Sequence, residues 1–317
     1  MSEAPFQSGD PGRPQDLQAA FAQYKYILGD QAAVVLFLAG RLGKPVLVEG
    51  PAGVGKTDLS RVLALTAGRR LIRLQCYEGL DESKALYEWQ YGKQLLYSQI
   101  LKDKISETMS DQPDLDQAME RIFSFEDLFF SERFLQPRPL LEAITSERPV
   151  VLLIDEVDKS DPEFEAFLLE VLSDFTVSIP EIGTIRAQTM PLVILTSNNS
   201  REMSDALKRR CLHLFLDFPP PEVELRIIRL KVPDLRETVA RQVVSLVERL
   251  RGLSLKKSPS ISETLDWAAA LVALSVDSLS EDVLDQTLSV LLKYESDLAR
   301  AREKLPELRL KAGGRSR

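Results

Sequence analysis

The 317-residue sequence predicts a three-layer α/β domain with a parallel five-stranded sheet, followed by a small all-helical domain. Short, continuous apolar runs recur through the first 220 residues with helical patterns between them, as is typical of parallel strands buried on both faces. Beyond Pro219–Pro221 every apolar pattern has a helical period. The predicted strands are 46–48, 71–74, 150–154, 192–195 and 212–218, and the later helical patterns are 223–230, 239–250, 262–274 and 281–298.

The same patterns set the expected domain organisation. A helix is expected from Asp30 to Leu42, because Val34, Val35 and Leu38 follow helical spacing until Pro45. The alternation that begins at Phe175, with a turn before Thr184, predicts a hairpin. We expect a flexible N-terminus at 1–16, a core at 17–218 with an acidic insertion at about 103–132 and the hairpin at about 175–187, a helical lid at 219–300, and a flexible tail at 301–317.

Composition excludes several classes of protein. The net charge of -8 argues against non-specific binding of nucleic acid or an anionic membrane. The longest uncharged stretch, 187–200, is too short and too polar to span a bilayer, and the N-terminus lacks the pattern of a secretory signal. With two cysteines far apart and one histidine, neither a zinc cluster nor a Cys/His nucleophile pair is expected. We therefore expect a cytoplasmic protein without membrane insertion.

The most specific motif is a phosphate-binding loop between a predicted strand and a predicted helix. Its residues match G-x-x-x-x-G-K-[ST], and the glycines allow successive backbone N–H groups to point at an anion. Lys56 would contact the β and γ phosphates of ATP, and the hydroxyl of Thr57 would bind Mg²⁺. The expected nucleotide-binding residues here are Gly50, Pro51, Ala52, Gly53, Val54, Gly55, Lys56, Thr57 and Asp58.

A pair of carboxylates ends the apolar strand 150–154. Asp155 at the carboxyl end of the strand suits contact with Mg²⁺ through a water molecule, and Glu156 suits activation of the attacking water. Such a pair also serves as an ordinary helix cap, but the phosphate loop upstream favours the catalytic interpretation.

Amides and arginines follow the next strand. Asn198 can hold a water molecule and a phosphate oxygen without adding charge, whereas Asn199 has the alternative role of shaping the turn. The basic cluster before the fifth strand contains Arg209 and Arg210, and a guanidinium group supplied in trans can stabilise developing phosphoryl charge. As an alternative, this cluster is a solvated charged run.

Together these motifs resemble those of an AAA+ ATPase of the MoxR type, over nearly all of residues 26–300. The resemblance includes the hydrophobic segment that begins at Ile27 and Leu28, which it places near the adenine. Within that family the chain is most similar to the CoxD branch, which is associated with maturation of molybdenum-containing hydroxylases. The segments that carry the resemblance are Ile27–Asp30, GPAGVGKT, VVLLIDEVDK, TSNN, ALKRR, Gln75–Asp81, Tyr87–Gln90 and Ser258–Trp267.

The resemblance implies roles for individual residues. Lys56 and Thr57 correspond to Walker A, Asp155 and Glu156 to Walker B, Asn198 to sensor 1, and Arg210, with Arg209 in reserve, to the arginine finger. It also implies a homo-oligomeric ring of six subunits, a partner with a von Willebrand factor A domain, and a client metalloenzyme. This chain departs from many relatives at Ser260, where they carry a sensor 2 arginine, so that Lys256 or Lys257 substitutes or the lid senses the γ-phosphate weakly.

Two alternatives to a remodelling ATPase stay open. A DNA-handling AAA+ ATPase, such as a clamp loader or helicase relative, shares the core, although a basic stripe is missing. A small-molecule kinase would share the phosphate loop alone. The acidic segment 103–132, with nine acidic and two basic residues, is either a solvated helix pair or a docking surface for a basic partner.

Overall fold

The computed structural model describes residues 12–99, 132–180 and 182–310, so the acidic segment lies outside the described residues except for Glu132. The described chain divides into two compact units. The first contains 38–47 and 67–212, and the second contains 12–37, 48–66 and 213–310. The domain boundary near residue 219 stays a prediction.

A parallel five-stranded sheet confirms the predicted fold class. All residues of β5 and β8 are buried, and each strand begins with one of the predicted apolar runs, 150–154 and 192–195. The pairing of β2 with β5 aligns Gln75 with Asp155, so that the polar residues at both strand ends lie at one edge. The strand order is β2-β5-β8-β1-β9, with β1 at Val46–Glu49, β2 at Arg70–Gln75, β5 at Val150–Asp155, β8 at Leu192–Ser197 and β9 at Leu212–Phe215.

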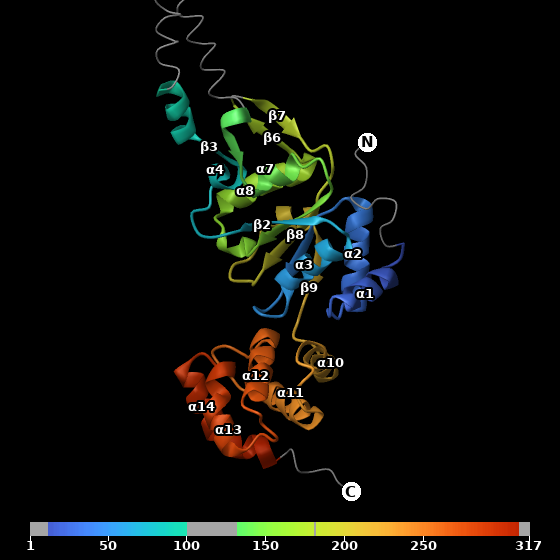
Figure 1. Cartoon of the computed structure of the whole chain (residues 1–317), viewed down its shortest axis with the longest axis vertical. Helices are drawn as coiled ribbons and strands as arrows, with labels where there is room; N and C mark the ends of the chain where they lie inside the picture. The colour runs from blue at the N-terminus through green and yellow to red at the C-terminus, as the bar shows by residue number, and fades with distance from the viewer. Residues whose placement is uncertain (1–11, 100–131, 181, 311–317) are drawn as a thin grey trace, which may run out of the picture. The chain divides into compact units, whose positions relative to one another are not determined.

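Helices pack against the sheet through one buried cluster in the first unit. Leu140, Leu141 and Ile144 of α7 are buried in the same core as Leu152 and Ile154 of β5, and Figure 1 shows α7 and α8 beside the strands. The predicted helix at 30–42 is confirmed as α2. The bounds are α1 Pro14–Gln23, α2 Asp30–Leu42, α3 Lys56–Thr66, α4 Glu82–Leu86, α7 Pro139–Ile144, α8 Pro162–Asp174 and α9 Asp205–Arg210.

Two small antiparallel hairpins accompany the sheet. The predicted hairpin is confirmed, with β6 at Thr176–Ile179 paired to β7 at Gly183–Arg186. A second hairpin was not predicted. It pairs β3 at Tyr87–Trp89 with β4 at Leu135–Pro137, so it joins the two sides of the segment that is not described.

The helices after residue 219 share a core of their own, coloured orange to red in Figure 1. Trp267 is fully buried there, and its indole N–H donates to Thr287 Oγ1 at 2.9 Å. The single run predicted at 281–298 is two helices, and the last of them includes ten residues of the expected flexible tail. The bounds are α10 Pro221–Lys231, α11 Glu237–Arg251, α12 Ile261–Ala273, α13 Glu281–Leu291 and α14 Glu295–Leu310.

A break at residues 292–294 separates α13 from α14. Leu291 and Leu292 are both buried in the core of these helices. Leu292 adopts an extended conformation, which turns its side chain inward and ends α13.

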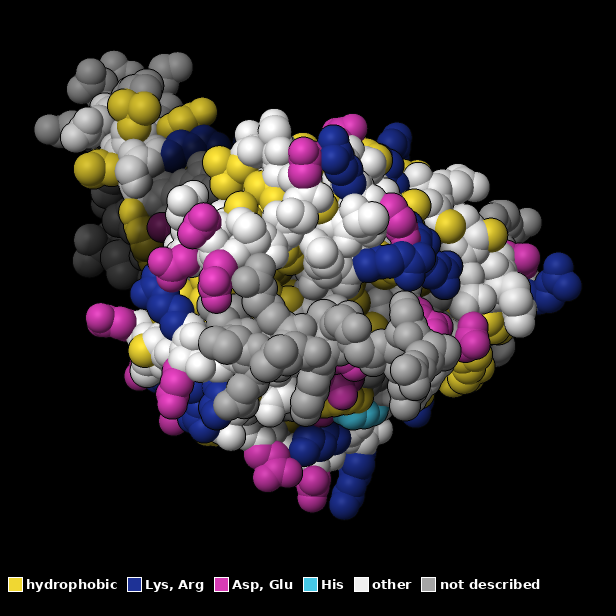
Figure 2. All heavy atoms as spheres, turned by 90° about the horizontal axis from the view of Figure 1, so that it is seen from below, with side chains coloured by type: hydrophobic (Ala, Val, Ile, Leu, Met, Phe, Trp, Pro, Cys, Tyr) yellow, Lys and Arg dark blue, Asp and Glu magenta, His cyan; other side chains and the backbone are white. Residues whose placement is uncertain are grey.

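The surface carries charges of both signs. Figure 2 shows Lys and Arg side chains interspersed with Asp and Glu side chains over one face. Exposed ion pairs such as Arg302–Asp285 link neighbouring helices. Among the described residues, no helix is both long and apolar enough to cross a membrane.

Candidate nucleotide site

The phosphate-binding loop lies between β1 and α3, where the sequence predicted it. Lys56 is buried, and its ammonium group donates to the backbone oxygens of Gly50 and Pro51, each at 2.7 Å. A Cβ atom at Gly50 would lie 1.9 Å from the Leu216 carbonyl oxygen, so only glycine fits there. The loop therefore wraps around its own lysine, as expected for a backbone that cradles phosphate. Thr57 follows at the start of α3 with an exposed side chain.

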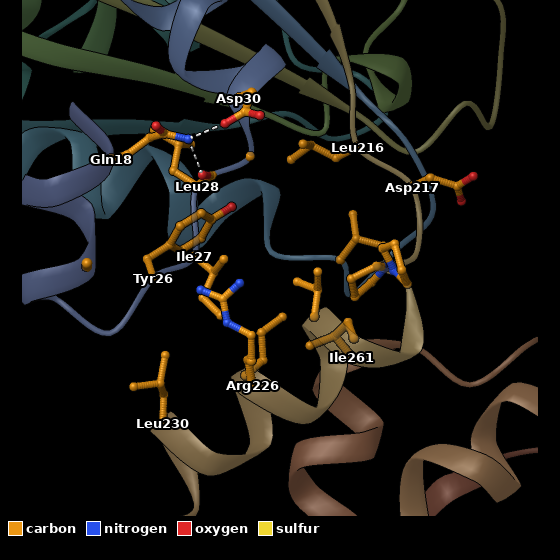
Figure 3. A pocket seen from close by; sticks show the side chains of 17 residues that line it. Gln18, Tyr26, Ile27, Leu28, Asp30, Leu216, Asp217, Arg226, Leu230 and Ile261 are labelled. Carbon is orange, nitrogen blue, oxygen red and sulfur yellow. Dashed lines mark hydrogen bonds between the residues drawn. The ribbon is translucent and has the colours of Figure 1, made fainter. Parts of the chain in front are cut away.

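A cavity of about 730 Å³ lies in the same unit as this loop (Figure 3). Ile27, Leu28 and Val54, all predicted from the sequence, line it. An apolar cavity with a few polar groups at its wall has the character of a small-molecule site. Its other lining residues include Gln18, Tyr26, Asp30, Leu216, Asp217, Val223, Arg226, Ile227, Leu230 and Ile261.

Two of these additional residues fix the wall of the cavity. Gln18 donates to the Leu28 carbonyl oxygen at 3.1 Å and to Asp30 Oδ1 at 2.8 Å, which are the dashed lines of Figure 3. Tyr26 donates to the Gly55 carbonyl oxygen at 3.4 Å and packs edge-on against Phe21. Burial, and secondarily the charge of Asp58, raises the pKa of Tyr26, so its hydroxyl stays protonated. These contacts join the apolar segment to the phosphate loop.

Asp155 lies at the carboxyl end of β5 in the first unit. Its side chain is 3% exposed. Oδ2 accepts from Arg73 Nε at 3.0 Å and Nη2 at 2.6 Å, and Oδ1 accepts from Thr196 Oγ1 at 2.5 Å. A buried carboxylate is stable only with such partners. Both oxygens are therefore held in fixed directions.

Glu156 is the next residue and has a left-handed backbone, with φ 57° and ψ 48°. For a residue other than glycine this conformation costs roughly 1–2 kcal/mol. It is held by the backbone N–H, which donates to Thr196 Oγ1 at 2.9 Å. The carboxylate accepts from Gln75 Nε2 at 2.9 Å, Asn198 Nδ2 at 3.2 Å and Lys159 Nζ at 2.7 Å. The strained backbone thus aims a partly exposed carboxylate at the edge of the sheet.

Asn198 and Asn199 make different contacts. Asn198 contacts Glu156, whereas Asn199 has a positive φ of 59°, and its backbone N–H donates to Ser197 Oγ at 3.0 Å. The next residue, Ser200, holds Asp158 through its hydroxyl and its N–H. Burial opposes ionisation of Asp158, but these hydrogen bonds keep the pKa of its carboxyl below the usual value. Asn199 and Ser200 therefore shape the turn.

Arg209 and Arg210 end the short helix α9. Ser204 caps its N-terminus by accepting from the Leu207 N–H at 3.3 Å. Both arginines are exposed, and the structure gives neither an ion pair within the described ranges. Lys208, by contrast, pairs with Glu202 at 3.2 Å.

The two lysines considered as substitutes for sensor 2 both contact residues that follow residue 219. Lys257 Nζ pairs with Glu263 Oε1 at 2.7 Å, and Lys256 Nζ lies 4.2 Å from the centre of the Tyr294 ring. Ser260 is buried at the N-cap of α12.

The fold and these groups of residues define a P-loop α/β protein. The profile of the ATPase family associated with various cellular activities (AAA) matches residues 46–219. This match covers more than half of the chain, and the chain belongs to the AAA family.

Two curated relatives are similar over most of the chain. The gas vesicle ATPase GvpN of Haloferax mediterranei is 28% identical over 252 residues, covering 77% of this chain and 66% of that protein. GvpN1 of Halobacterium salinarum is 25% identical over 281 residues, covering 83% and 73%. The chain thus spans about two thirds of the length of the first.

Among solved structures, the Thermotoga maritima RuvB Holliday junction branch migration motor matches with a TM-score of 0.45 and 18% identity. The match covers 89% of this chain and 72% of that chain. A variant of the same RuvB gives a TM-score of 0.47 and 19% identity.

Proposed function

We propose that the protein hydrolyses ATP to ADP and phosphate with Mg²⁺ and uses the cycle to remodel a client protein. The hydrogen bond between Asn198 and Glu156 is the observation that carries this proposal. It places the carboxylate of Glu156, which can accept a proton, beside the neutral amide of Asn198. The two residues follow adjacent strands of a domain of the AAA family. This arrangement suits a water molecule that must be both deprotonated and held in place.

Binding of ATP is assigned to the second unit. The base would occupy the cavity lined by Ile27, Leu28 and Val54. The phosphates would lie in the loop Gly50–Thr57, where Lys56 exchanges its bonds to loop carbonyls for phosphate oxygens. The N-terminus of α3, including Asp58, follows this loop.

Thr57 and Asp155 are the residues that the sequence motifs assign to Mg²⁺, and both carry oxygen donors. Mg²⁺ prefers oxygen ligands and retains several of its waters. Because both oxygens of Asp155 already accept hydrogen bonds, this residue suits contact through a metal-bound water. The motif assigns direct contact to the hydroxyl of Thr57. When bound, the ion would neutralise charge on the β and γ phosphates.

In the hydrolytic step, the carboxylate of Glu156 takes a proton from water as the water oxygen bonds to the γ-phosphorus. The bond from phosphorus to the β–γ bridging oxygen breaks, and ADP leaves with the electron pair. Gln75 and Lys159 orient the carboxylate, and Asn198 orients the water or a γ-phosphate oxygen. Arg210 of a neighbouring copy, with Arg209 in reserve, would stabilise the charge that develops.

The assembly and the client follow from the resemblance rather than from geometry. The MoxR-type motifs, most similar to the CoxD branch, support a six-membered ring, a partner with a von Willebrand factor A domain, and a molybdenum hydroxylase as client. The curated relatives named as gas vesicle ATPases favour a second candidate, a gas vesicle protein as the client. Identification of proteins retained by the Glu156→Gln variant in ATP would choose between these clients.

The test of the enzymatic proposal compares three variants. Glu156→Gln should retain ATP and hydrolyse it at least about 100-fold more slowly, because the base is lost. Glu163→Gln changes an exposed glutamate of α8 and should keep the wild-type rate. Lys56→Ala should lose ATP affinity in a calorimetric assay. Near-normal phosphate release by Glu156→Gln, or unchanged ATP binding by Lys56→Ala, would refute these assignments.

A further inference from the structure

The first residues of α12 contact the phosphate-binding loop directly. The backbone N–H and the hydroxyl of Ser262 both donate to the carbonyl oxygen of Gly53, each at 3.2 Å. Two donors of one residue therefore converge on one acceptor in the middle of the loop. Both residues belong to the second unit.

Packing around Ser260 makes this contact close. Ser260 is 2% exposed, and its hydroxyl donates to Glu263 Oε2 at 2.5 Å while its backbone N–H donates to the same oxygen at 2.7 Å. Gly53 has a φ of +77°, and a Cβ atom there would lie 2.2 Å from Ser260 Oγ. Any other residue at position 53 would push α12 away from the loop.

The segment before α12 is fixed by the lid itself. The backbone N–H groups of Lys256 and Lys257 donate to the two oxygens of Asp297 at 2.9 and 3.1 Å. The ammonium group of Lys257 pairs with Glu263 in the first turn of α12. A second tie joins α10 to α3, where Lys231 Nζ lies 3.5 Å from Asp58 Oδ2.

We propose that Ser262 is a positioning residue that holds the lid against the phosphate loop. The lid then contacts the backbone of the loop and does not contact the γ-phosphate. The proposal rests on the nucleotide site proposed above. An arginine that contacts the γ-phosphate would favour ATP over ADP. A hydroxyl that contacts only Gly53 stabilises the loop equally with ATP or ADP bound, because the contact does not involve the γ-phosphate.

The test measures dissociation constants of ATP and ADP by calorimetry, all in the Glu156→Gln background so that ATP persists. Ser262→Ala should weaken both nucleotides by about 2- to 10-fold, the range for loss of one neutral hydrogen bond, with an unchanged ratio between them. Ser262→Thr keeps the hydroxyl and should restore both affinities. Because Ser262 is exposed, neither change threatens folding.

Ser280→Ala is the matched control. Ser280 caps α13 by accepting from the Val283 N–H, so its loss should lower the Tm of the lid without changing nucleotide affinity. A fall in affinity for ATP alone in Ser262→Ala would overturn the proposal in favour of γ-phosphate sensing. Unchanged affinities would overturn it as well. If the parent Glu156→Gln protein itself retained no nucleotide, the proposed function would fail, and this inference with it.

Discussion

The side-chain amide of Asn198 donates to Glu156 Oε1 at 3.2 Å, joining the residues that follow two adjacent strands of the sheet. Gln75, at the end of β2, donates to the other oxygen of the same carboxylate. Three neighbouring strands therefore orient one carboxylate. This convergence explains how a single residue with an unfavourable backbone conformation is held in place.

Replacement of Asn198 should impair hydrolysis selectively. Asn198→Ala should lower kcat by about 100-fold, the usual loss when one preorganised donor is removed, while ATP binding changes little. The matched control is Asn199→Gly, because glycine tolerates the positive φ of 59° at that position. Steady-state phosphate release over a range of ATP concentrations separates kcat from KM. Equal kcat values for the two variants would contradict the role assigned to Asn198.

Much of the fold was predictable because the signals are local. The buried strands β5 and β8 each begin with an uninterrupted apolar run, and the glycine-rich loop has a fixed spacing to its lysine. By contrast, the pairing of Gln75 with Glu156 joins residues 81 positions apart. The hairpin of β3 and β4 likewise joins distant segments. No local pattern encodes such pairings, since each depends on the completed sheet.

The nucleotide site divides in the same way. Ile27 and Leu28 were identified through the family resemblance, and both line the cavity. Tyr26 directly precedes them, and an aromatic residue next to that segment could have been predicted to line the cavity as well. Nothing in the sequence indicated that Arg226 lines the cavity, because its helix is separated from the loop by more than 160 residues. Arg226 reaches the cavity only in the folded structure.

Arg226 should contribute to binding of the base. Figure 3 shows its side chain rising from α10 toward Ile27, and it is the one cationic side chain among the described residues that line the cavity. A guanidinium group near an aromatic base is worth about 0.5–1 kcal/mol at an exposed site, so Arg226→Ala should raise the Kd for ATP by about 2- to 5-fold. Arg229→Ala is the control, because Arg229 lies on the same helix as Arg226 but pairs with Glu237 of α11. Identical calorimetric Kd values for the two variants would argue against contact with the base.

The stability of the helices after residue 219 should depend on a buried ion pair. Arg251 contacts both oxygens of Glu224, at 2.6 and 2.9 Å, and donates to the Pro259 carbonyl oxygen at 2.8 Å. Glu224 is 1% exposed, so Arg251→Met would leave a buried charge without its partner. We expect the free energy of unfolding to fall by about 3–5 kcal/mol in urea titrations. Arg302→Ala removes an exposed pair and should cost about 0–1 kcal/mol. A comparable loss in both variants would show that the burial of Glu224 is unimportant.

Arg210 should act on the site of a neighbouring subunit. Arg210→Ala should bind ATP normally, and its rate of hydrolysis should fall by about 10³-fold or more, because no arginine stabilises the charge of the transition state. The parallel variant Arg209→Ala should be affected less. Both side chains are exposed, so a general loss of folding is not expected, and a thermal melt would verify this.

Mixing experiments separate action in trans from action within one subunit. In a head-to-tail ring, an Arg210→Ala subunit supplies an intact Glu156, and an adjacent Glu156→Gln subunit supplies an intact Arg210. An equal mixture would then contain complete sites at about a quarter of its interfaces, and hydrolysis should recover in proportion. Lys56→Ala mixed with Glu156→Gln is the control, because both residues serve the site of their own subunit and no complete site can form. Failure of the first mixture to recover at any ratio would remove the basis for an arginine supplied in trans.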